Sequence, residues 1–274
     1  MPMAALSSHA HKRTLFFQLF VVTYVNVAFC TALGSRGHHA FRHTHSHNWL
    51  PATATWYGSP SGDGSDGGAC GYGRLVRTPY GTHVSAGSPV LFRNGEGCGA
   101  CYQVKCLGNG CSQGGLRVVI TDECPGGYCA FGRTHFDMSG SAFGRLALSH
   151  NDAPALLNEG LIHVLYRRVS CSYHGRDIAF QMNQGATNFW FSMSIRYEAG
   201  DGDLSKVQLM EGQSQVWRDM EHLWGAYWCL NGGPLSGPFS IRITTSSGST
   251  LTAQNAIPYN WVPGQIYSST VNFP

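Results

Sequence analysis

Cysteines constrain this chain more than any other feature of its sequence. Eight of the 10 cysteines lie in one stretch, from Cys70 to Cys171. They can pair in about a hundred ways, so the count alone fixes no disulfide. The Cys98-x-x-Cys101 spacing also occurs in zinc sites. Disulfide bonding is favoured over zinc binding if the chain is secreted. Cys229, outside this group, is interpreted as a buried free thiol or, alternatively, as a site of intermolecular pairing. The eight are Cys70, Cys98, Cys101, Cys106, Cys111, Cys124, Cys129 and Cys171.

A secretory signal is indicated at the N-terminus. Basic residues at 11–13 precede an uncharged apolar run at 15–30, and small residues follow it. A membrane-spanning helix needs about 20 apolar residues, whereas this run is shorter and is interrupted by Gln18 and Asn26. Residues 1–32 are therefore predicted to be a signal peptide and residues 33–51 an irregular, His-rich lead-in. The mature protein is expected to be secreted, with disulfides and no transmembrane segment.

The composition argues against a nucleic-acid partner. Charged residues make up 12% of the chain, its formal net charge is +3, and it contains no block of basic residues. Aromatic residues are frequent by contrast, with 14 Phe, 12 Tyr and 7 Trp. Such a surface suits an uncharged polymer. No cofactor or metal is predicted, although a His-rich lead-in is a composition that can bind metal.

Two regions of different character follow the lead-in. From 52 to 172 the chain is rich in Cys and Gly, and short apolar runs between turns predict strands, with short helices near 141–148 and 153–158. From 177 to 274 apolar and polar residues alternate, which predicts an antiparallel β-sandwich. The first strand of this second region is expected to turn one apolar face inward, made of Phe189, Phe191, Met193, Ile195 and Tyr197.

Trp190 is an exception on the other face of that strand, where its neighbours are Ser192, Ser194 and Arg196. A large exposed ring among polar side chains indicates a binding surface, so Trp190 is a candidate for ligand stacking. Packing of Trp190 against the first region is the alternative. Trp224 is a second candidate for stacking on a ligand.

Two carboxylates in the first region are candidates for chemistry. Asp122 ends an apolar strand, and Asp137 lies two residues after His135, before a glycine. Glycoside hydrolysis needs two such acids, one to protonate the leaving oxygen and one to activate water. A turn or capping role is the alternative for an aspartate at a strand end. His135 would depress the pKa of Asp137 if it were protonated, or else it packs in the fold.

Several motifs together resemble the plant expansin family. They occur in the expected order from about residue 52 to the C-terminus, and the YEAGDGD segment at 197–203 is similar to the beta subfamily. The motifs are Thr55-Trp56-Tyr57-Gly58, Gly67-Gly68-Ala69-Cys70-Gly71-Tyr72, Gly97-Cys98-Gly99-x-Cys101-Tyr102, Thr121-Asp122-Glu123-Cys124-Pro125-Gly126-Gly127, His135-Phe136-Asp137 followed by Ser139-Gly140, Arg167-Arg168-Val169-x-Cys171 and Gly237-Pro238-Phe239-Ser240.

The resemblance implies a mainly β protein of two domains. Residues 52–172 would form a six-stranded double-psi β-barrel related to family-45 endoglucanases. Residues 177–274 would form an immunoglobulin-like β-sandwich, similar to grass-pollen group-1 allergens and to family-63 carbohydrate-binding modules. The resemblance also implies the pairs Cys70–Cys98, Cys101–Cys171 and Cys106–Cys111, which leaves Cys124 and Cys129 to bond to each other.

The resemblance further implies a polysaccharide-binding groove. Its polar residues match Thr55, Tyr57, Asp122 and Asp137, with Asp66 a match in a variable loop, and Trp56, Trp190 and Trp224 would add stacking faces. Asp137 matches the general acid of the related hydrolases. The catalytic base of those enzymes follows the first-strand tyrosine, but here no carboxylate follows Tyr57 before Asp63. The chain is therefore predicted not to be an enzyme.

The implied function is that of a secreted protein of the plant cell wall. It would act as a monomer, bind cellulose, xylan or matrix glucans, and disrupt their non-covalent contacts without hydrolysis. Two alternatives remain open, an active endoglucanase or lytic transglycosylase of the same barrel superfamily, and a module that only binds carbohydrate.

Overall fold

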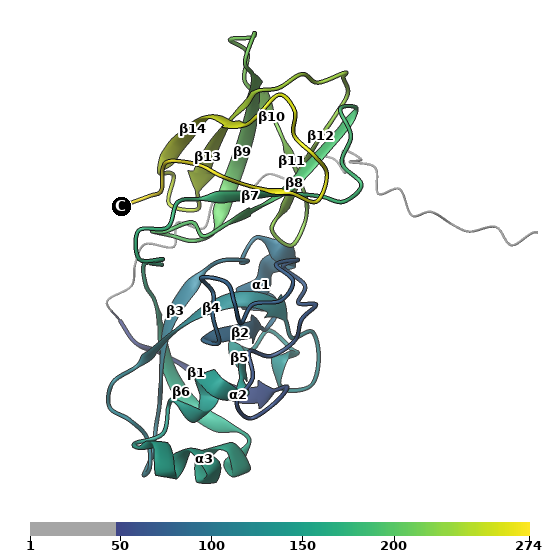
Figure 1. Ribbon diagram of the computed structural model, residues 1–274. Coiled ribbons are helices and arrows are strands. Elements are labelled where there is room, and N and C mark those ends of the chain that lie inside the picture. Colours follow the sequence, from purple (N-terminus) through teal and green to yellow (C-terminus); the bar gives the residue numbers. More distant parts are fainter. Residues whose placement is uncertain (1–47) are drawn as a thin grey trace, which may run out of the picture.

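The computed structural model describes residues 48–274, which form two β domains stacked end to end (Figure 1). The predicted signal peptide and most of the predicted lead-in lie outside the described residues. The first strand begins at Leu50, two residues before the barrel was expected to start. Among the described residues, none of the helices has the length and apolar character needed to cross a membrane.

The N-terminal domain is the predicted six-stranded barrel. Its strands close in the order β1-β5-β2-β4-β3-β6. The pairs β1–β5 and β2–β4 are parallel, and the remaining pairs are antiparallel. The strands are β1 (Leu50–Tyr57), β2 (Val84–Gly87), β3 (Cys101–Cys106), β4 (Leu116–Glu123), β5 (His135–Ser139) and β6 (Ile162–Arg168).

Three short α-helices accompany the barrel, and α3 lies at the end far from the second domain (Figure 1). Helix α2 starts directly after β5 because Ser139 caps it, with its side-chain oxygen accepting a hydrogen bond from the Ala142 amide. The helices are α1 (Pro89–Phe92), α2 (Gly140–Gly144) and α3 (Ala153–Glu159), with 3-10 turns at Arg93–Gly95, Gly127–Cys129 and His150–Asp152. The helix expected at 141–148 is thus shorter than predicted.

The C-terminal domain is the predicted β-sandwich. A four-stranded sheet, β10-β9-β13-β14, faces a five-stranded sheet, β11-β12-β8-β7-β15. The strands are β7 (Ala179–Met182), β8 (Trp190–Arg196), β9 (Leu204–Glu211), β10 (Arg218–Asp219), β11 (Glu221–Trp224), β12 (Tyr227–Asn231), β13 (Phe239–Thr245), β14 (Thr250–Ile257) and β15 (Ile266–Ser268).

The predicted apolar core face is present along β8 but not at its start, and the polar residues of the other face, Ser192, Ser194 and Arg196, are buried as well. Phe191, Met193 and Ile195 are buried in the sandwich core. Phe189 precedes the strand and is exposed, so its assignment to the core face was wrong. Burial here follows from strand pairing, which begins only at Trp190, opposite Asn231 of β12.

All four expected disulfides are present, as Cys70–Cys98, Cys101–Cys171, Cys106–Cys111 and Cys124–Cys129. They remove Cys98 and Cys101 as zinc ligands. The interpretation of Cys229 as a free thiol is contradicted, because this residue is fully buried and disulfide-bonded.

A buried ion cluster joins the two domains. Asp203 of the sandwich accepts hydrogen bonds from two arginines of the barrel, Arg93 and Arg168, the latter at 2.6 Å. Ser246 donates to the same carboxylate at 2.6 Å, and Arg168 also donates to the Asp201 carbonyl at 2.6 Å. Every oxygen of this buried acid therefore has a donor, which is what a charge out of water requires.

The backbones of the two domains also touch directly. Gly99 and Gly202 both have positive φ, and a Cβ on either would lie 2.2–2.3 Å from the carbonyl oxygen of the other. The Ala226 amide donates to the Cys70 carbonyl at 3.0 Å, and the Cys171 amide donates to the Gly200 carbonyl at 2.7 Å. Only glycine fits at such a contact, so the domains are held in a fixed relation.

Glu198 lies inside this interface, beside a cluster of tyrosine rings. Its side chain is 2% exposed, and its Oε2 atom has no hydrogen-bond partner among the described residues. Burial raises the pKa of Glu198 to about 8; the charge of Asp203 adds to this rise and that of Arg196 opposes it. The surrounding rings, whose centroids lie 4.5–5.8 Å from their neighbours, are Tyr72, Tyr80, Tyr173 and Tyr197.

Candidate functional site

A row of polar side chains runs along two parallel strands of the barrel. In the register of β1 and β5, Thr53 lies opposite His135 and Thr55 lies opposite Asp137. Side chains two residues apart point to the same side of a strand, so these four groups and Tyr57 share one face. The intervening residues of both strands face the other way, where Ala54, Phe136 and Met138 are fully buried in the barrel core.

Hydrogen bonds link four members of this row in a chain. The Thr55 hydroxyl donates to Asp137 at 2.7 Å, so it must accept from His135 Nε2, which lies 2.8 Å away. Burial lowers the pKa of His135 to about 4, so the imidazole is neutral near pH 7. With its proton on Nε2, its Nδ1 accepts from the Thr53 hydroxyl at 2.7 Å, and the ring orients Thr55 toward the Asp137 carboxylate.

The structure corrects the expectation that a charged His135 would depress the pKa of Asp137. His135 is fully buried, and this burial lowers its pKa to about 4. Burial also raises the pKa of Asp137; the hydrogen bond from Thr55 opposes this rise, and the negative charge of Asp122 adds to it. Asp137 is thus a half-buried acid whose environment favours its protonated form more than water does.

Asp122 lies on the same wall of the barrel. Ala86 of β2 pairs with Asp122 on one side and with Asp137 on the other, so the two aspartates are two strands apart, about 10 Å between Cα atoms. Burial, followed by the charges of Asp122 and Asp137, raises the pKa of Tyr57. The tyrosine and the two acids therefore belong to one electrostatic site.

The oxygens of Asp122 are already engaged. Its Oδ1 accepts the Ala69 amide at 2.6 Å and the Glu123 amide at 2.8 Å, and its Oδ2 accepts the Ser65 hydroxyl at 3.2 Å. Asp122 thus holds the glycine-rich loop against the end of β4. Three donors already occupy its two oxygens, so Asp122 is a structural anchor of the loop rather than an open acceptor.

Two other acids of this loop differ in their positions. Asp66 forms an exposed ion pair with Arg74 at 3.0 Å, so the structure does not bring it into the polar row. Asp63, which sequence reasoning placed in a flexible loop, acts by its charge on Tyr57, and its buried Oδ2 has no hydrogen-bond partner among the described residues. Asp63 lies near Tyr57 because the loop folds back over this ring, so closely that a Cβ atom built on Gly64 would lie 2.4 Å from the Tyr57 hydroxyl.

Trp56 points away from the polar row. It pairs with Met138 of the core-facing set, and its indole N–H donates to the Leu157 carbonyl of α3 at 2.9 Å. Trp56 packs against the barrel core, whereas its neighbour Tyr57 faces the acids. Strict alternation along β1 was the sequence signal that separates these two rings.

An aromatic platform lies on the sandwich where it meets the barrel. Trp224 is 44% exposed and stacks on Tyr227, with ring centroids 4.8 Å apart and planes 22° apart. A Cβ on Gly71 of the barrel would lie 2.6 Å from each of the two rings. Sequence reasoning missed Tyr227; the tight Gly225–Ala226 turn between β11 and β12 was the signal that could have placed it beside Trp224.

Trp190 lies on the same sheet but away from that pair. Ser194 of β8 is opposite Tyr227, and Trp190 lies four residues earlier on the same side of the strand, which is about 13 Å along it. Trp190 is half-buried, and its indole nitrogen is buried without a hydrogen-bond partner among the described residues.

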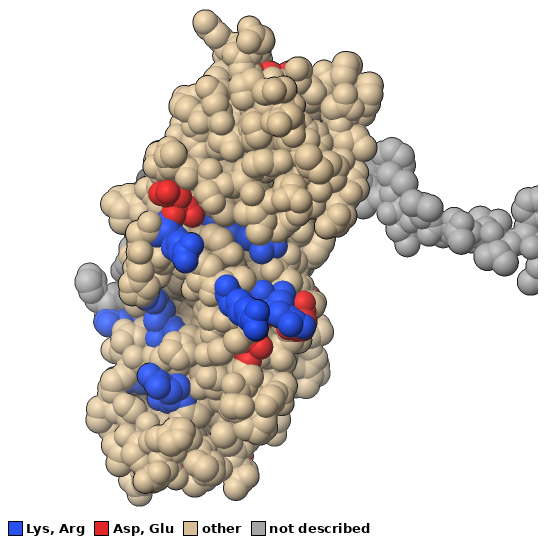
Figure 2. Space-filling model, viewed as in Figure 1, with Lys and Arg blue, Asp and Glu red and all other residues tan. Residues whose placement is uncertain are grey.

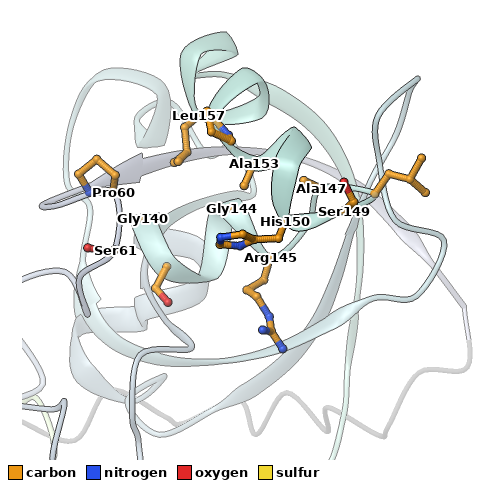
Figure 3. A pocket seen from close by; sticks show the side chains of 13 residues that line it. Pro60, Ser61, Gly140, Gly144, Arg145, Ala147, Ser149, His150, Ala153 and Leu157 are labelled. Carbon is orange, nitrogen blue, oxygen red and sulfur yellow. The ribbon is translucent and has the colours of Figure 1, made fainter.

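A cavity of about 530 Å³ is lined by residues that follow β1 and β5 in the chain (Figure 3). It lies between the loop that follows β1 and helices α2 and α3, and most of its lining is apolar. Arg145 and His150 provide its nitrogen-bearing side chains, beside the hydroxyls of Ser61, Ser141 and Ser149. Sequence reasoning did not identify this cavity, because its lining comes from three separate segments.

Charge is sparse on the face of the molecule in Figure 2, where lysine, arginine and acidic side chains gather mainly around the junction of the two domains and along the barrel. A closed barrel with a row of hydroxyl and carboxyl groups, joined to a sandwich with an exposed aromatic platform, defines a two-domain class of protein whose surface suits an uncharged, hydroxyl-rich polymer.

The comparisons with known proteins identify the family within that class. The family described as "Expansin C-terminal domain" matches residues 178–258, and the one described as "Lytic transglycolase" matches residues 84–166. Expansin-B16 of Oryza sativa subsp. japonica is 52% identical over 99% of this chain and 100% of its own. Expansin-B3 of Arabidopsis thaliana is 54% identical over 85% of this chain and 88% of its own. The chain therefore belongs to the expansin family, among relatives named expansin-B.

A solved structure supports the fold. The apo form of an expansin from Clavibacter michiganensis has a TM-score of 0.64 and 22% identity, and the match covers 83% of this chain and 99% of that one. A mutant of that bacterial protein, with a TM-score of 0.64 and 20% identity, was solved in complex with cellohexaose. Family membership confirms the predicted general function, the loosening of plant cell walls.

Proposed function

We propose that this expansin acts as a secreted monomer in the plant cell wall, where it binds cellulose, xylan or matrix glucans across both domains without cutting them. In this proposal residues 1–32 are removed as a signal peptide, residues 52–172 supply the polar row and residues 177–274 supply the aromatic platform. The cellohexaose complex of the bacterial relative supports a glucan as one ligand. The observation that carries the proposal is the pairing of one half-buried acid, Asp137, with a second acid already tied to three donors.

Binding of this kind loosens a wall by mass action. Flat rings such as those of Trp224 and Tyr227 stack on the C–H faces of sugars without needing a charge. Hydroxyl groups that are freed when a chain leaves its neighbour would bond to Thr55, Tyr57 and Asp137. A protein that binds the separated chain better than the paired one shifts the equilibrium toward separation.

Hydrolysis would need more than this arrangement. Protonated Asp137 is suited to act as an acid, but a second carboxylate must also accept a proton from water on the opposite side of the bond. Asp122 has its oxygens engaged, which leaves Asp63 as the acid to test. A single general acid or base contributes about 10²- to 10⁴-fold to rate, so its absence removes useful turnover.

The decisive experiment measures extension of heat-inactivated wall strips under constant load together with release of reducing ends. The wild type is expected to extend the strips and to release no reducing ends from soluble glucan or xylan. Asp137→Ala is expected to lower the extension rate about tenfold to a hundredfold, because loss of one hydrogen bond to a charged group costs about 1.5–3 kcal/mol. Glu159→Ala, at an exposed position of α3, is the matched control.

Steady release of reducing ends by the wild type, abolished by Asp137→Asn and by Asp63→Asn, would establish a hydrolase instead. Full extension by Asp137→Ala with binding retained would remove the polar row from the mechanism.

The aromatic platform gives a separate prediction. Trp224→Ala and Tyr227→Ala are each expected to weaken binding to insoluble wall polysaccharide about tenfold, since ring stacking is worth about 1–3 kcal/mol per ring. Pull-down isotherms measure this. Trp217→Ala is the matched control, because Arg242 covers its ring at 4.0 Å. Trp190→Ala, measured in parallel, tests whether the platform extends to Trp190; unchanged binding there returns this ring to a packing role.

A further inference from the structure

The loop between β4 and β5 projects from the barrel on a rigid base. The Cys124–Cys129 disulfide closes its first part, residues 124–129. Cys129 is fully buried, and the Cys124 amide donates to the Gly87 carbonyl at 2.9 Å, so both ends are anchored. A Cβ built on Gly126 or Gly127 would meet no atom within 4 Å. The middle of the loop therefore stands in solvent while its ends are fixed.

Two aromatic side chains extend from this loop into water. Tyr128 is 54% exposed and Phe131 is 91% exposed. Phe131 also has a φ of 62°, in the left-handed region that bulky residues rarely adopt. Core packing cannot explain a ring that is nearly all in solvent. Both rings are uncharged, so the surface they offer is flat and apolar.

Tyr128 connects the loop to the polar row. Its ring stacks on the imidazole of His135, with centroids 6.1 Å apart and planes 17° apart. His135 is the residue that orients Thr55 toward Asp137. Part of the Tyr128 ring thus lies over His135 of the row, and 54% of the side chain stays exposed to a ligand. Asp137 lies two residues beyond His135 on β5, about 7 Å along the strand.

We propose that Tyr128 and Phe131 form a second aromatic subsite, which stacks on sugar rings of a neutral polysaccharide chain bound along the polar row. The proposal rests on the proposed function and extends it, since it adds a stacking surface on the barrel separate from Trp224 and Tyr227. Continuity with the row selects the occupant: a chain whose hydroxyls bond to Asp137 and Thr55 meets the exposed part of Tyr128 next. Tyr128, which lies inside the disulfide-closed segment and stacks on His135, loses little conformational freedom on binding, which favours affinity.

Calorimetric titration with cellotriose and cellohexaose tests the subsite. Wild type is expected to bind the longer oligosaccharide more tightly. Tyr128→Ala and Phe131→Ala are each expected to weaken cellohexaose binding about fivefold to a hundredfold, as loss of one stacked ring implies, and to weaken cellotriose binding less. Tyr128→Phe keeps a flat ring and is expected to recover most of the affinity lost in Tyr128→Ala.

Tyr259→Ala is the matched control, because Tyr259 is an exposed aromatic residue in a loop of the sandwich. Thermal unfolding midpoints equal to that of wild type establish that the exposed substitutions leave the fold intact. Wild-type affinity in both alanine variants would overturn the subsite while leaving the proposed function in place. Failure of the wild type to bind any oligosaccharide or insoluble glucan would instead count against the proposed function.

Discussion

Replacing Glu198 with glutamine is expected to remove a large part of the pH dependence of folding stability between about pH 5 and about pH 8. Glu198 is buried at the interface of the two domains with one oxygen unpartnered, and its pKa is raised from 4.5 to about 8. In the unfolded chain its pKa returns to the ordinary value. Across the intervening pH range the folded protein therefore holds a proton that the unfolded chain has released.

The sign of the effect follows from this difference. Because the folded state binds more protons, the free energy of unfolding falls as pH rises from about 4.5, and the full loss is reached above about pH 8. At about 1.4 kcal/mol per pH unit, the shift corresponds to about 4–5 kcal/mol. Glutamine has nearly the shape of a protonated glutamate and stays neutral at every pH. The free energy of unfolding of Glu198→Gln should therefore exceed that of wild type by an amount that grows with pH toward this value.

Denaturant titrations of both proteins, at a series of pH values from about 5 to about 8, measure the difference. Subtraction of the two curves cancels the contribution of His135, whose lowered pKa gives the opposite slope below about pH 6.5. Glu221→Gln, an exposed acid at the start of β11, should follow wild type at every pH. Parallel curves for wild type and Glu198→Gln would show that Glu198 does not titrate in this range.

The sequence predicted the fold well because its signals are local. Alternation along β8 placed Phe191, Met193 and Ile195 in the sandwich core, and the motifs around the cysteines identified the barrel and its disulfides. The sequence singled out Asp122 near the end of its strand and Asp137 in its His-Phe-Asp motif, and pairing of both strands with β2, parallel for β4 and antiparallel for β5, sets the two acids on one wall. Each of these features depends on residues close in sequence or on a recognisable motif.

The details of the site depend on contacts that no local pattern contains. Trp224 lies where it does because Gly71, far away in the chain, leaves room for its ring. Asp66 forms an exposed ion pair with Arg74, whereas its loop folds back and places Asp63 where its charge acts on Tyr57. The disulfide bond of Cys229 could not be predicted, since no motif around an isolated cysteine distinguishes a free thiol from a bonded one.

Asp203→Ala is expected to lower the free energy of unfolding by about 3–5 kcal/mol. The substitution leaves Arg168, which is 5% exposed, as a buried charge without its counter-ion, and it also removes the acceptor for Arg93 and Ser246. Breaking one side of a buried pair costs about this much, because the remaining charge stays out of water. Denaturant titration at about pH 5.5, where Glu198 is protonated, measures this loss without a contribution from the ionisation of Glu198.

A double variant, Asp203→Leu with Arg168→Met, separates charge from contact. Two apolar side chains of similar size remove the stranded charge, so this variant should recover part of the stability lost in Asp203→Ala. Lys206→Ala is the control, because its ion pair with Asp219 is exposed and should cost less than about 1 kcal/mol. Equal stability of Asp203→Ala and wild type would mean that the cluster does not hold the domains together.

If the domains do separate, wall extension should fall although every residue of the polar row is intact, because the row and the platform of Trp224 and Tyr227 would no longer be fixed along one polysaccharide chain.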